Sequence, residues 1–360
     1  MIRKYIVMVG LACWLFFLPV PTSSSANEQI INPSPSSTPS TLPLSLSDEP
    51  PTTRLLFAGQ IVPGRCVQAG VERRGNADYI YANVRDIIQS ADLAIATLNG
   101  SITDISPSVG CVVNTLVLSG TPVQTFAIAN AGFDVVSVST NHINNCSLNN
   151  CGYRPFLDTL TSLKRAGIVA IGGGNNLTEA LIPRFYTING VRFAFISLGE
   201  IEPGVFATYD HPGIAALNEA NLFKILQMAR KYADVVIFLP HWGPEYNPLP
   251  NPSQMKYARL AVAEGADLII GNHTHVIQGQ QIIDGVQVFY GLGNFVFDQS
   301  WDLSLRSSLL VEVTYVGKEY RGYRIIPVVA AKDGLLSFPP EEDRLQILTD
   351  FENASKKIKP

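Results

Sequence analysis

Four of the five histidines directly follow apolar runs that predict buried strands. They are His142, His241, His273 and His275, whereas the fifth, His211, lies in a predicted loop. In open α/β sheets, ligands bind beyond the carboxyl ends of the parallel strands, so we expect the four imidazoles at one edge of one sheet. Neutral imidazole is a good ligand for zinc, iron and related metals. The alternative is a polar cluster that satisfies the backbone groups of loops.

The His-x-His spacing sharpens the metal hypothesis. If the backbone is extended over His273-Thr274-His275, both imidazoles lie on the same side of the chain. Together with His241 they would then supply three nitrogen ligands. The sequence has no G-x-S-x-G segment, which argues against an ordinary serine hydrolase.

The elements that must position these side chains are short apolar runs that alternate with longer amphipathic segments. This pattern is typical of βαβ units with parallel strands. The last part of the domain differs, because its strands have no helices between them and Asp284-Gly285 predicts a tight hairpin. We therefore expect one α/β domain over residues 54–335, in which antiparallel strands complete the parallel ones.

Composition supports a large core. Hydrophobic residues make up 46% of the chain and charged residues 16%, which fits strands that are covered on both faces. The net charge of −4 provides no general attraction to nucleic acid, so we expect no nucleic-acid partner. An anionic ligand would need a local site.

The two ends of the chain differ from the domain. In residues 1–26, Arg3 and Lys4 precede an apolar run and then small residues, an order typical of a secretory signal. The run is about as short as a spanning helix can be, so an uncleaved anchor is the alternative. Residues 27–53 are rich in Ser, Thr and Pro and predict a disordered spacer, and residues 336–360 predict a polar tail. We expect an exported protein, extracellular or in the cell envelope.

Four cysteines follow the expected signal. An even number in an exported protein favours disulfides. Cys146 and Cys151 are close enough in sequence to clip one loop, which leaves Cys66 to pair with Cys111. The alternative is a zinc site, but the spacing contains no CxxC pair.

Six short motifs occur in order along the domain. They are Ala58-Gly59-Gln60 with Gly64-Arg65, Ala91-Asp92, Asn141-His142, His241-Trp242-Gly243-Pro244-Glu245, Gly271-Asn272-His273-Thr274-His275 and Gly293-Asn294-Phe295-Val296-Phe297-Asp298. This set resembles the CapA family of capsule synthesis proteins, which is associated with poly-γ-glutamate and is related to the calcineurin-like metallophosphoesterases. The resemblance implies two packed mixed sheets flanked by helices, an αββα sandwich.

Three positions depart from the family pattern. Gln60, Asn99 and Asn145 stand where the resemblance implies acidic residues. Two dications about 4 Å apart repel by roughly 16 kcal/mol at an effective dielectric constant of about 20, and carboxylates normally neutralise them. We therefore predict a partly degraded site that holds at most one divalent ion, either zinc, iron or manganese.

The resemblance also implies roles for single residues. His142 and Glu245 are candidates for proton transfer, and Arg65 and Asn294 are candidate substrate contacts. Glu245 or Asp298 could supply the missing charge. The alternatives are a loop carboxylate for Glu245, a turn residue for Asp298 and a solvated arginine for Arg65. The expected metal ligands are Asn141, His241, His273 and His275, with His142 as a further candidate.

Two functions fit these features. In the first, the protein serves the synthesis of a poly-γ-glutamate-type capsule or surface polymer and binds the anionic polymer or its precursor, with membrane-bound synthesis proteins as partners. In the second, it is an active mononuclear metal-dependent hydrolase of phosphoesters or amides. The histidines favour the hydrolase, whereas the amides in place of acids favour binding without turnover.

Overall fold

The computed structural model describes residues 50–105, 109–146 and 151–359. The expected signal segment and residues 27–49 of the expected spacer lie outside the described residues. Across the described ranges, no helix has the length and apolar character needed to cross a bilayer. The first strand begins at Thr52, two residues before the predicted domain boundary.

The first sheet is mixed and is built around β1. Its spatial order is β18 (Leu336–Ser337), β17 (Glu319–Ala330), β16 (Ser307–Val316), β1 (Thr52–Ile61), β2 (Leu93–Leu98), β5 (Val135–Ser137) and β6 (Val169–Ile171), and β15 (Asn294–Val296) also pairs with β1. Strand β1 runs parallel to β2 and antiparallel to β16. The predicted change from parallel to antiparallel strands is therefore confirmed.

The second sheet is mixed as well. Its order is β13 (Gln280–Ile283), β14 (Val286–Phe289), β12 (Leu268–Ile270), β11 (Val235–His241), β9 (Val191–Gly199) and β8 (Arg184–Ile188). Both edge strands are antiparallel to their neighbours and join them through tight turns, Asp284-Gly285 and Asn189-Gly190, whose residues all have positive φ. Such turns match the twist of the flanking strands. The first hairpin is the predicted one, and the second was missed.

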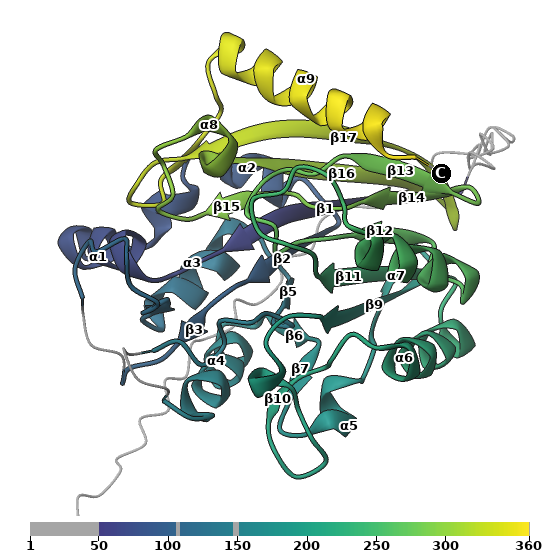
Figure 1. Cartoon of the computed structure of the whole chain (residues 1–360), viewed down its shortest axis with the longest axis horizontal. Coiled ribbons are helices and arrows are strands. Elements are labelled where there is room, and N and C mark those ends of the chain that lie inside the picture. Colours follow the sequence, from purple (N-terminus) through teal and green to yellow (C-terminus); the bar gives the residue numbers. More distant parts are fainter. Residues whose placement is uncertain (1–49, 106–108, 147–150, 360) are drawn as a thin grey trace, which may run out of the picture. The chain divides into compact units, whose positions relative to one another are not determined.

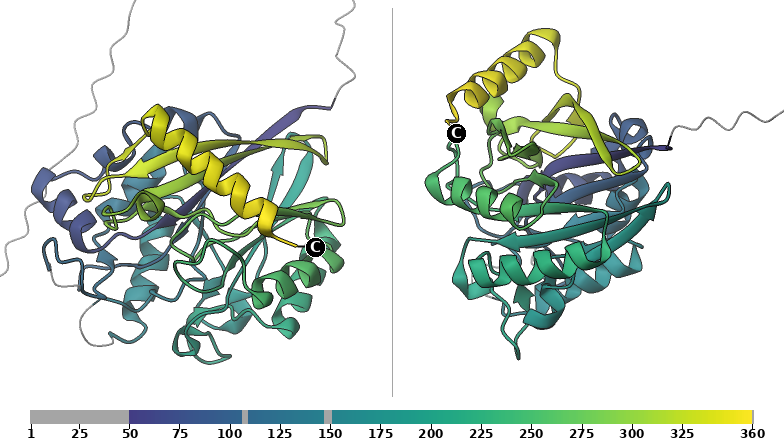
Figure 2. Two further views of the ribbon diagram at one scale, coloured as in Figure 1. Left: turned by 45° about the horizontal axis from the view of Figure 1, so that its top comes forward. Right: turned by 90° about the vertical axis from the view of Figure 1, so that its right-hand side faces the viewer.

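The two sheets pack face to face (Figures 1 and 2). In β1, Leu55 and Phe57 enter the core between the sheets, while Leu56 and Ala58 face the outer helices, as the two-residue period of a strand requires. The rings of Phe193 and Tyr315, one from each sheet, lie 5.3 Å apart. The sandwich expected from the sequence is therefore confirmed.

Helices cover both outer faces. The first sheet carries α1 (Arg65–Arg74), α2 (Arg85–Gln89), α3 (Val123–Ala131), α4 (Arg154–Arg165) and the 3-10 turn η1 (Asp78–Tyr81), and the second carries α5 (Leu177–Ala180), α6 (Glu219–Tyr232) and α7 (Pro252–Ala263). The smaller elements are β3 (Ser101–Ile102), β4 (Ser119–Gly120), β7 (Gly173–Gly174), β10 (Gly213–Ile214), η2 (Pro203–Val205) and α8 (Leu303–Arg306).

The segment after residue 335 is ordered structure and not the polar tail that the sequence predicts. It forms β18 and the helix α9 (Glu341–Lys357), which contacts β13 and β17 and so touches both sheets (Figure 1). The Phe351 ring stacks against Phe289 with centroids 6.4 Å apart. The apolar face of α9 is a narrow stripe of Ile347, Phe351 and Ala354 in a polar helix, which gives only a weak periodic signal.

Candidate functional site

The predicted site residues meet where the carboxyl ends of strands from both sheets lie together. The first sheet supplies Gln60, Asn99, Asn141 and His142, and the second supplies His241, His273 and His275. The prediction of one edge of one sheet is therefore wrong. His241 also belongs to β11 itself, as its last residue. The polar side chains gather at the junction of the two sheets.

A compact donor set lies at the centre of this cluster. His241 Nε2 is 3.1 Å from His273 Nδ1 and 3.0 Å from Asn141 Oδ1. Ligands of one tetrahedral zinc ion, bound at about 2.0–2.1 Å, stand roughly 3.3 Å apart. In the described part of the chain, no three His, Cys, Asp or Glu side chains are grouped to hold an ion. The set that fits one ion thus consists of two imidazoles and one amide oxygen, without a negative charge.

His275 stands apart from this set. Its Nδ1 lies 2.8 Å from Asn294 Oδ1, and its Nε2 lies 3.8 Å from Glu245 Oε1. Donation from Nδ1–H to the amide oxygen leaves Nε2 with a free lone pair. The Tyr246 ring stacks on the imidazole at 5.8 Å between centroids. The structure therefore brings three of the four expected metal ligands together and turns the fourth toward an exposed carboxylate.

The backbone around these histidines is unusual. His273 has a φ of 100° and His275 a φ of 59°, in a region that residues other than glycine seldom adopt. The segment is therefore not extended, and the condition that would place both imidazoles on one side of the chain is not met. Between the two, the carbonyl of Thr274 accepts from the Tyr246 backbone N–H at 2.8 Å. Such conformations persist only where surrounding contacts hold them, and they cluster at functional sites.

Two of the three amides at the expected acidic positions bond to each other. The Asn99 side chain donates to Gln60 Oε1 at 2.9 Å, and Gln60 Nε2 donates to the His273 carbonyl at 3.2 Å. Both amides are fully buried. The backbone N–H of the third, Asn145, donates to the His142 carbonyl at 3.2 Å. A neutral hydrogen-bond network thus occupies the space that carboxylates would otherwise fill.

The imidazoles of the cluster are held neutral. Burial, and then the proximity of other histidines, lowers the pKa of His142 to about 4 and that of His273 to about 3. Burial lowers the pKa of His275 to about 4, and the pKa of the buried His241 falls well below its usual range. A neutral imidazole is the form that binds metal or accepts a hydrogen bond.

Several buried polar atoms of the cluster have no hydrogen-bond partner among the described residues. They are Asn99 Oδ1, His142 Nδ1, His241 Nδ1 and Asn272 Oδ1. An unsatisfied buried polar group costs about 1–3 kcal/mol, so native proteins contain few of them. Because four such atoms lie together here, we infer that the cluster is suited to bind a ligand, an ion or ordered water that would satisfy them.

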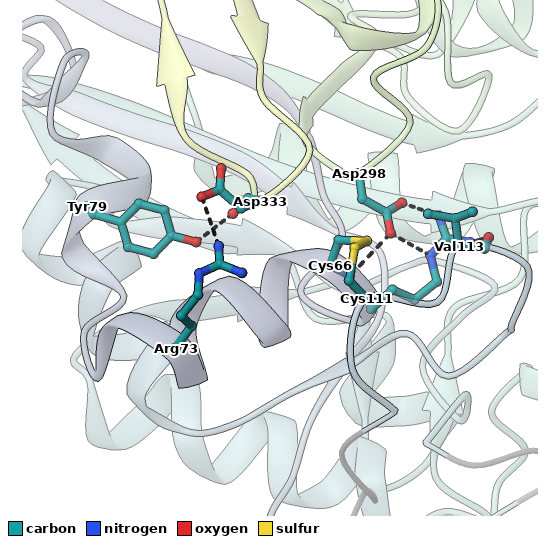
Figure 3. The surroundings of a disulfide bond; sticks show 8 residues. Cys66, Arg73, Tyr79, Cys111, Val113, Asp298 and Asp333 are labelled. Carbon is teal, nitrogen blue, oxygen red and sulfur yellow. Dashed lines mark hydrogen bonds and ion pairs between the residues drawn. A yellow bond between two sulfur atoms is a disulfide. The ribbon is translucent and has the colours of Figure 1, made fainter.

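Arg65 and Asp298 form a buried clamp instead of contacting the cluster. Arg65 Nε donates to Asp298 Oδ2 at 3.0 Å, a second bond joins Nη2 to Oδ1, and Nη1 donates to the Val113 carbonyl at 2.8 Å. Asp298 also accepts from the Cys66 backbone N–H at the start of α1 (Figure 3). The structure thus pairs Arg65, the candidate substrate contact, with Asp298, a candidate for the missing charge.

Both expected disulfides are present. Cys66–Cys111 lies beside the clamp (Figure 3), and Cys146–Cys151 closes the short loop after His142. The first ties the start of α1 to the segment whose Val113 carbonyl accepts from Arg65.

Asn294 is a structural contact as well. Its Nδ2 donates to Gln299 Oε1 at 3.1 Å and to the Leu305 carbonyl at 2.9 Å, and its Oδ1 faces His275, so its hydrogen-bonding capacity is used inside the protein. Gln299 and Tyr246 were missed by the sequence analysis. Each directly follows a residue that the motifs did single out, Asp298 and Glu245, and this adjacency was the available signal.

Comparison with known proteins gives a consistent result. Residues 54–299 match the family described as bacterial capsule synthesis protein PGA_cap. The capsule biosynthesis protein CapA of Bacillus anthracis is 30% identical over 71% of this chain and 62% of its own length. The PGA biosynthesis protein CapA of Bacillus subtilis is 29% identical over 71% of this chain and 66% of its own length. The chain thus spans less than two thirds of the length of these relatives.

Solved structures also align with this chain. The 5'-nucleotidase precursor of Thermus thermophilus has a TM-score of 0.48 and 14% identity, covering 84% of this chain and 58% of that one. The NAD nucleotidase of Haemophilus influenzae has a TM-score of 0.48 and 11% identity, covering 84% and 63%.

Proposed function

Because this chain belongs to the bacterial capsule synthesis protein family, we propose that it serves the synthesis of a poly-γ-glutamate-type surface polymer. Its cluster of histidines and amides is the place where polymer or precursor binds, and no two-metal phosphoesterase reaction takes place there. The names of the two CapA relatives support the polymer class.

The observation that carries this proposal is the neutrality of the donor set. His241, His273 and Asn141 converge without a carboxylate, and Gln60 and Asn99 bond to each other where acids would neutralise a second ion. One divalent ion fits this set, and two do not, because their mutual repulsion would stay uncompensated. A bound ion would supply Lewis acidity toward an oxygen of the ligand.

The second candidate function is a mononuclear hydrolase of phosphoesters or amides. The arrangement of Glu245 favours it, because this carboxylate is 36% exposed and lies 3.8 Å from His275 Nε2. An exposed carboxylate beside a neutral imidazole can accept a proton from water during attack on a bound substrate.

Export and partners are also part of the proposal. Two disulfides suit an oxidising compartment, in agreement with the secretory signal expected at the N-terminus. An exported protein of this class would act beside membrane-bound polymer synthesis proteins, and the N-terminal segment would either be cleaved or keep it at the membrane.

The test compares metal content and turnover in four purified proteins. These are the wild type, His241→Ala, the matched control His211→Ala at an exposed histidine, and the double variant Gln60→Asp/Asn99→Asp. We expect at most one ion per wild-type and His211→Ala chain, loss of that ion in His241→Ala, and at least about tenfold tighter metal binding once the acids return.

Turnover then separates the two functions. Screening with phosphoesters and γ-glutamyl amides should give no activity that depends on His241 in the wild type. Two ions per wild-type chain, or turnover that disappears in His241→Ala and persists in His211→Ala, would overturn the binding function in favour of the hydrolase.

A further inference from the structure

Gln299 connects two parts of the site that are far apart in sequence. Its side chain is buried and uses both ends of the amide: Oε1 accepts from Asn294 Nδ2 at 3.1 Å, and Nε2 donates to the Tyr246 hydroxyl at 3.0 Å. No other described side chain bonds to both Asn294 and Tyr246.

Both partners of Gln299 contact His275, one at a ring nitrogen and the other at the ring face. Asn294 Oδ1 accepts from the imidazole at Nδ1, in the plane of the ring, at 2.8 Å. The Tyr246 ring lies against the face of the imidazole at an interplanar angle of 23°. Gln60 Nε2 also lies 3.2 Å from Nδ1 of His275, but it donates to the His273 carbonyl and to Asn294 Oδ1 as well. The shorter contact with Asn294 therefore sets which nitrogen carries the proton, and the stacked ring limits the tilt of the imidazole.

The orientation of Asn294 depends on Gln299. Because Oε1 of Gln299 accepts from Nδ2, the Asn294 amide presents its oxygen, and not its nitrogen, to His275. The Leu305 carbonyl supports the same orientation with a second bond at 2.9 Å, and Gln60 Nε2 supports it by donating to Asn294 Oδ1 at 3.4 Å. Loss of Gln299 would therefore weaken the orientation without abolishing it.

Gln299 is itself held in place by its neighbour in the chain. Asp298 is fully buried and is bonded by Arg65 and by the backbone N–H of Cys66. Figure 3 shows this carboxylate beside the Cys66–Cys111 disulfide. The backbone that carries Gln299 is thus anchored one residue away from its side chain, as a precise site requires.

We propose that Gln299 is a positioning residue for His275: it keeps the imidazole protonated at Nδ1 and open at Nε2, toward Glu245. Outer partners of this kind commonly set the tautomer and direction of functional imidazoles. The inference rests on the proposed function in one respect, which is that Nε2 of His275 faces the ligand. The tautomer of His275 is a property of the free protein and does not depend on that function.

The test measures the His275 tautomer by ¹⁵N imidazole NMR of the full chain at pH 7 without metal. In Gln299→Leu we expect the ratio of the Nε2–H to the Nδ1–H form to rise about fivefold, as for the loss of one hydrogen bond. Gln299→Glu should keep the wild-type ratio, because a carboxylate can accept from both Asn294 and the Tyr246 hydroxyl. Gln287→Leu, at a buried glutamine whose side chain donates to Gln280 and Gln281, is the control and should not change it.

The inference is overturned if the His275 signals of Gln299→Leu stay those of the wild type, or if Gln287→Leu changes them equally. Should Gln299→Leu fail to fold, Tyr246→Phe removes one partner from a half-exposed side chain, and a wild-type ratio there would overturn the inference too. Because no metal or polymer is present, this result is independent of the metal-content experiment that tests the proposed function.

Discussion

The same two segments of the chain contribute to both the clamp and the histidine cluster, yet the clamp contains paired charges and the cluster contains neutral groups. Residues 60–65 give Gln60 to the cluster and Arg65 to the clamp, and residues 294–298 give Asn294 and Asp298 likewise. In the clamp, opposite charges neutralise each other, and each nitrogen and oxygen of the two charged groups has a hydrogen-bond partner. In the cluster every group is neutral, and several polar atoms remain unmatched.

This difference distinguishes a structural region, the clamp, from a candidate binding region, the cluster, that lies only a few residues away in sequence. The charged groups of the clamp are paired with each other and tie the segment around Arg65 to the segment around Asp298. The unmatched atoms of the cluster gain stability only when something binds them. Buried charge alone would have pointed to the clamp as the active centre, whereas incomplete hydrogen bonding points to the cluster.

The largest expected effect comes from breaking the clamp. Arg65→Ala leaves Asp298 buried without a partner and should lower the free energy of unfolding by about 3–5 kcal/mol. Arg321→Ala removes the exposed pair with Glu319 and should cost at most about 1 kcal/mol. Urea unfolding followed by circular dichroism measures both, and equal losses would mean that the clamp does not hold the structure.

We also expect the two disulfides to contribute unequally to the free energy of unfolding. Cys66–Cys111 joins residues 45 apart in sequence, whereas Cys146–Cys151 joins residues 5 apart. Loop-closure entropy predicts that the double serine variants lose about 4 and about 2 kcal/mol respectively. Thermal unfolding of the two variants tests the order, and a larger loss for the short loop would contradict the entropic account.

We expect the histidine cluster to make the folded protein less stable at acid pH. Because the folded-state pKa values of His142 and His273 lie near 4 and 3, below the unfolded value of about 6.5, the unfolded state takes up protons first as pH falls. Stability is therefore complete above about pH 6.5 and falls from there toward pH 3–4, by up to about 1.4 kcal/mol per pH unit for each imidazole.

Two variants check the origin of that slope. In His273→Asn, the pH dependence of the urea midpoint should become shallower, while Gln287→Leu, at a buried glutamine outside the cluster, should keep the wild-type slope. An unchanged slope in His273→Asn would show that the acid sensitivity arises elsewhere.

Much of the fold could be predicted because parallel strands covered on both faces are continuous apolar runs. The sequence does not show which sheet each run joins. The segments around Val135–Ser137 and Val191–Gly199 look alike, yet they lie in different sheets, since strand order is decided by pairings between distant residues. That is why the histidines were expected at one sheet and are found between two.

The residue types of the site could be predicted as well, but their partners could not. Arg65 and Asp298 are 233 positions apart, and either one alone resembles a ligand-binding group. The positive φ of His273 is likewise invisible to a pattern that assumes an extended chain. Local sequence spacing predicts which residue types could bind a ligand, whereas the contacts of the folded chain determine which of them are paired with each other.

The position of β1 has a consequence for how the molecule is made. Its antiparallel partner is β16, so that Thr52 faces Val316, and it arrives only after nearly all of the domain has been synthesised. Until then one side of the central strand exposes a row of unpaired N–H and C=O groups that can pair with other chains. A growing or truncated chain that stops before Ser307 should therefore depend on a chaperone to stay out of aggregates.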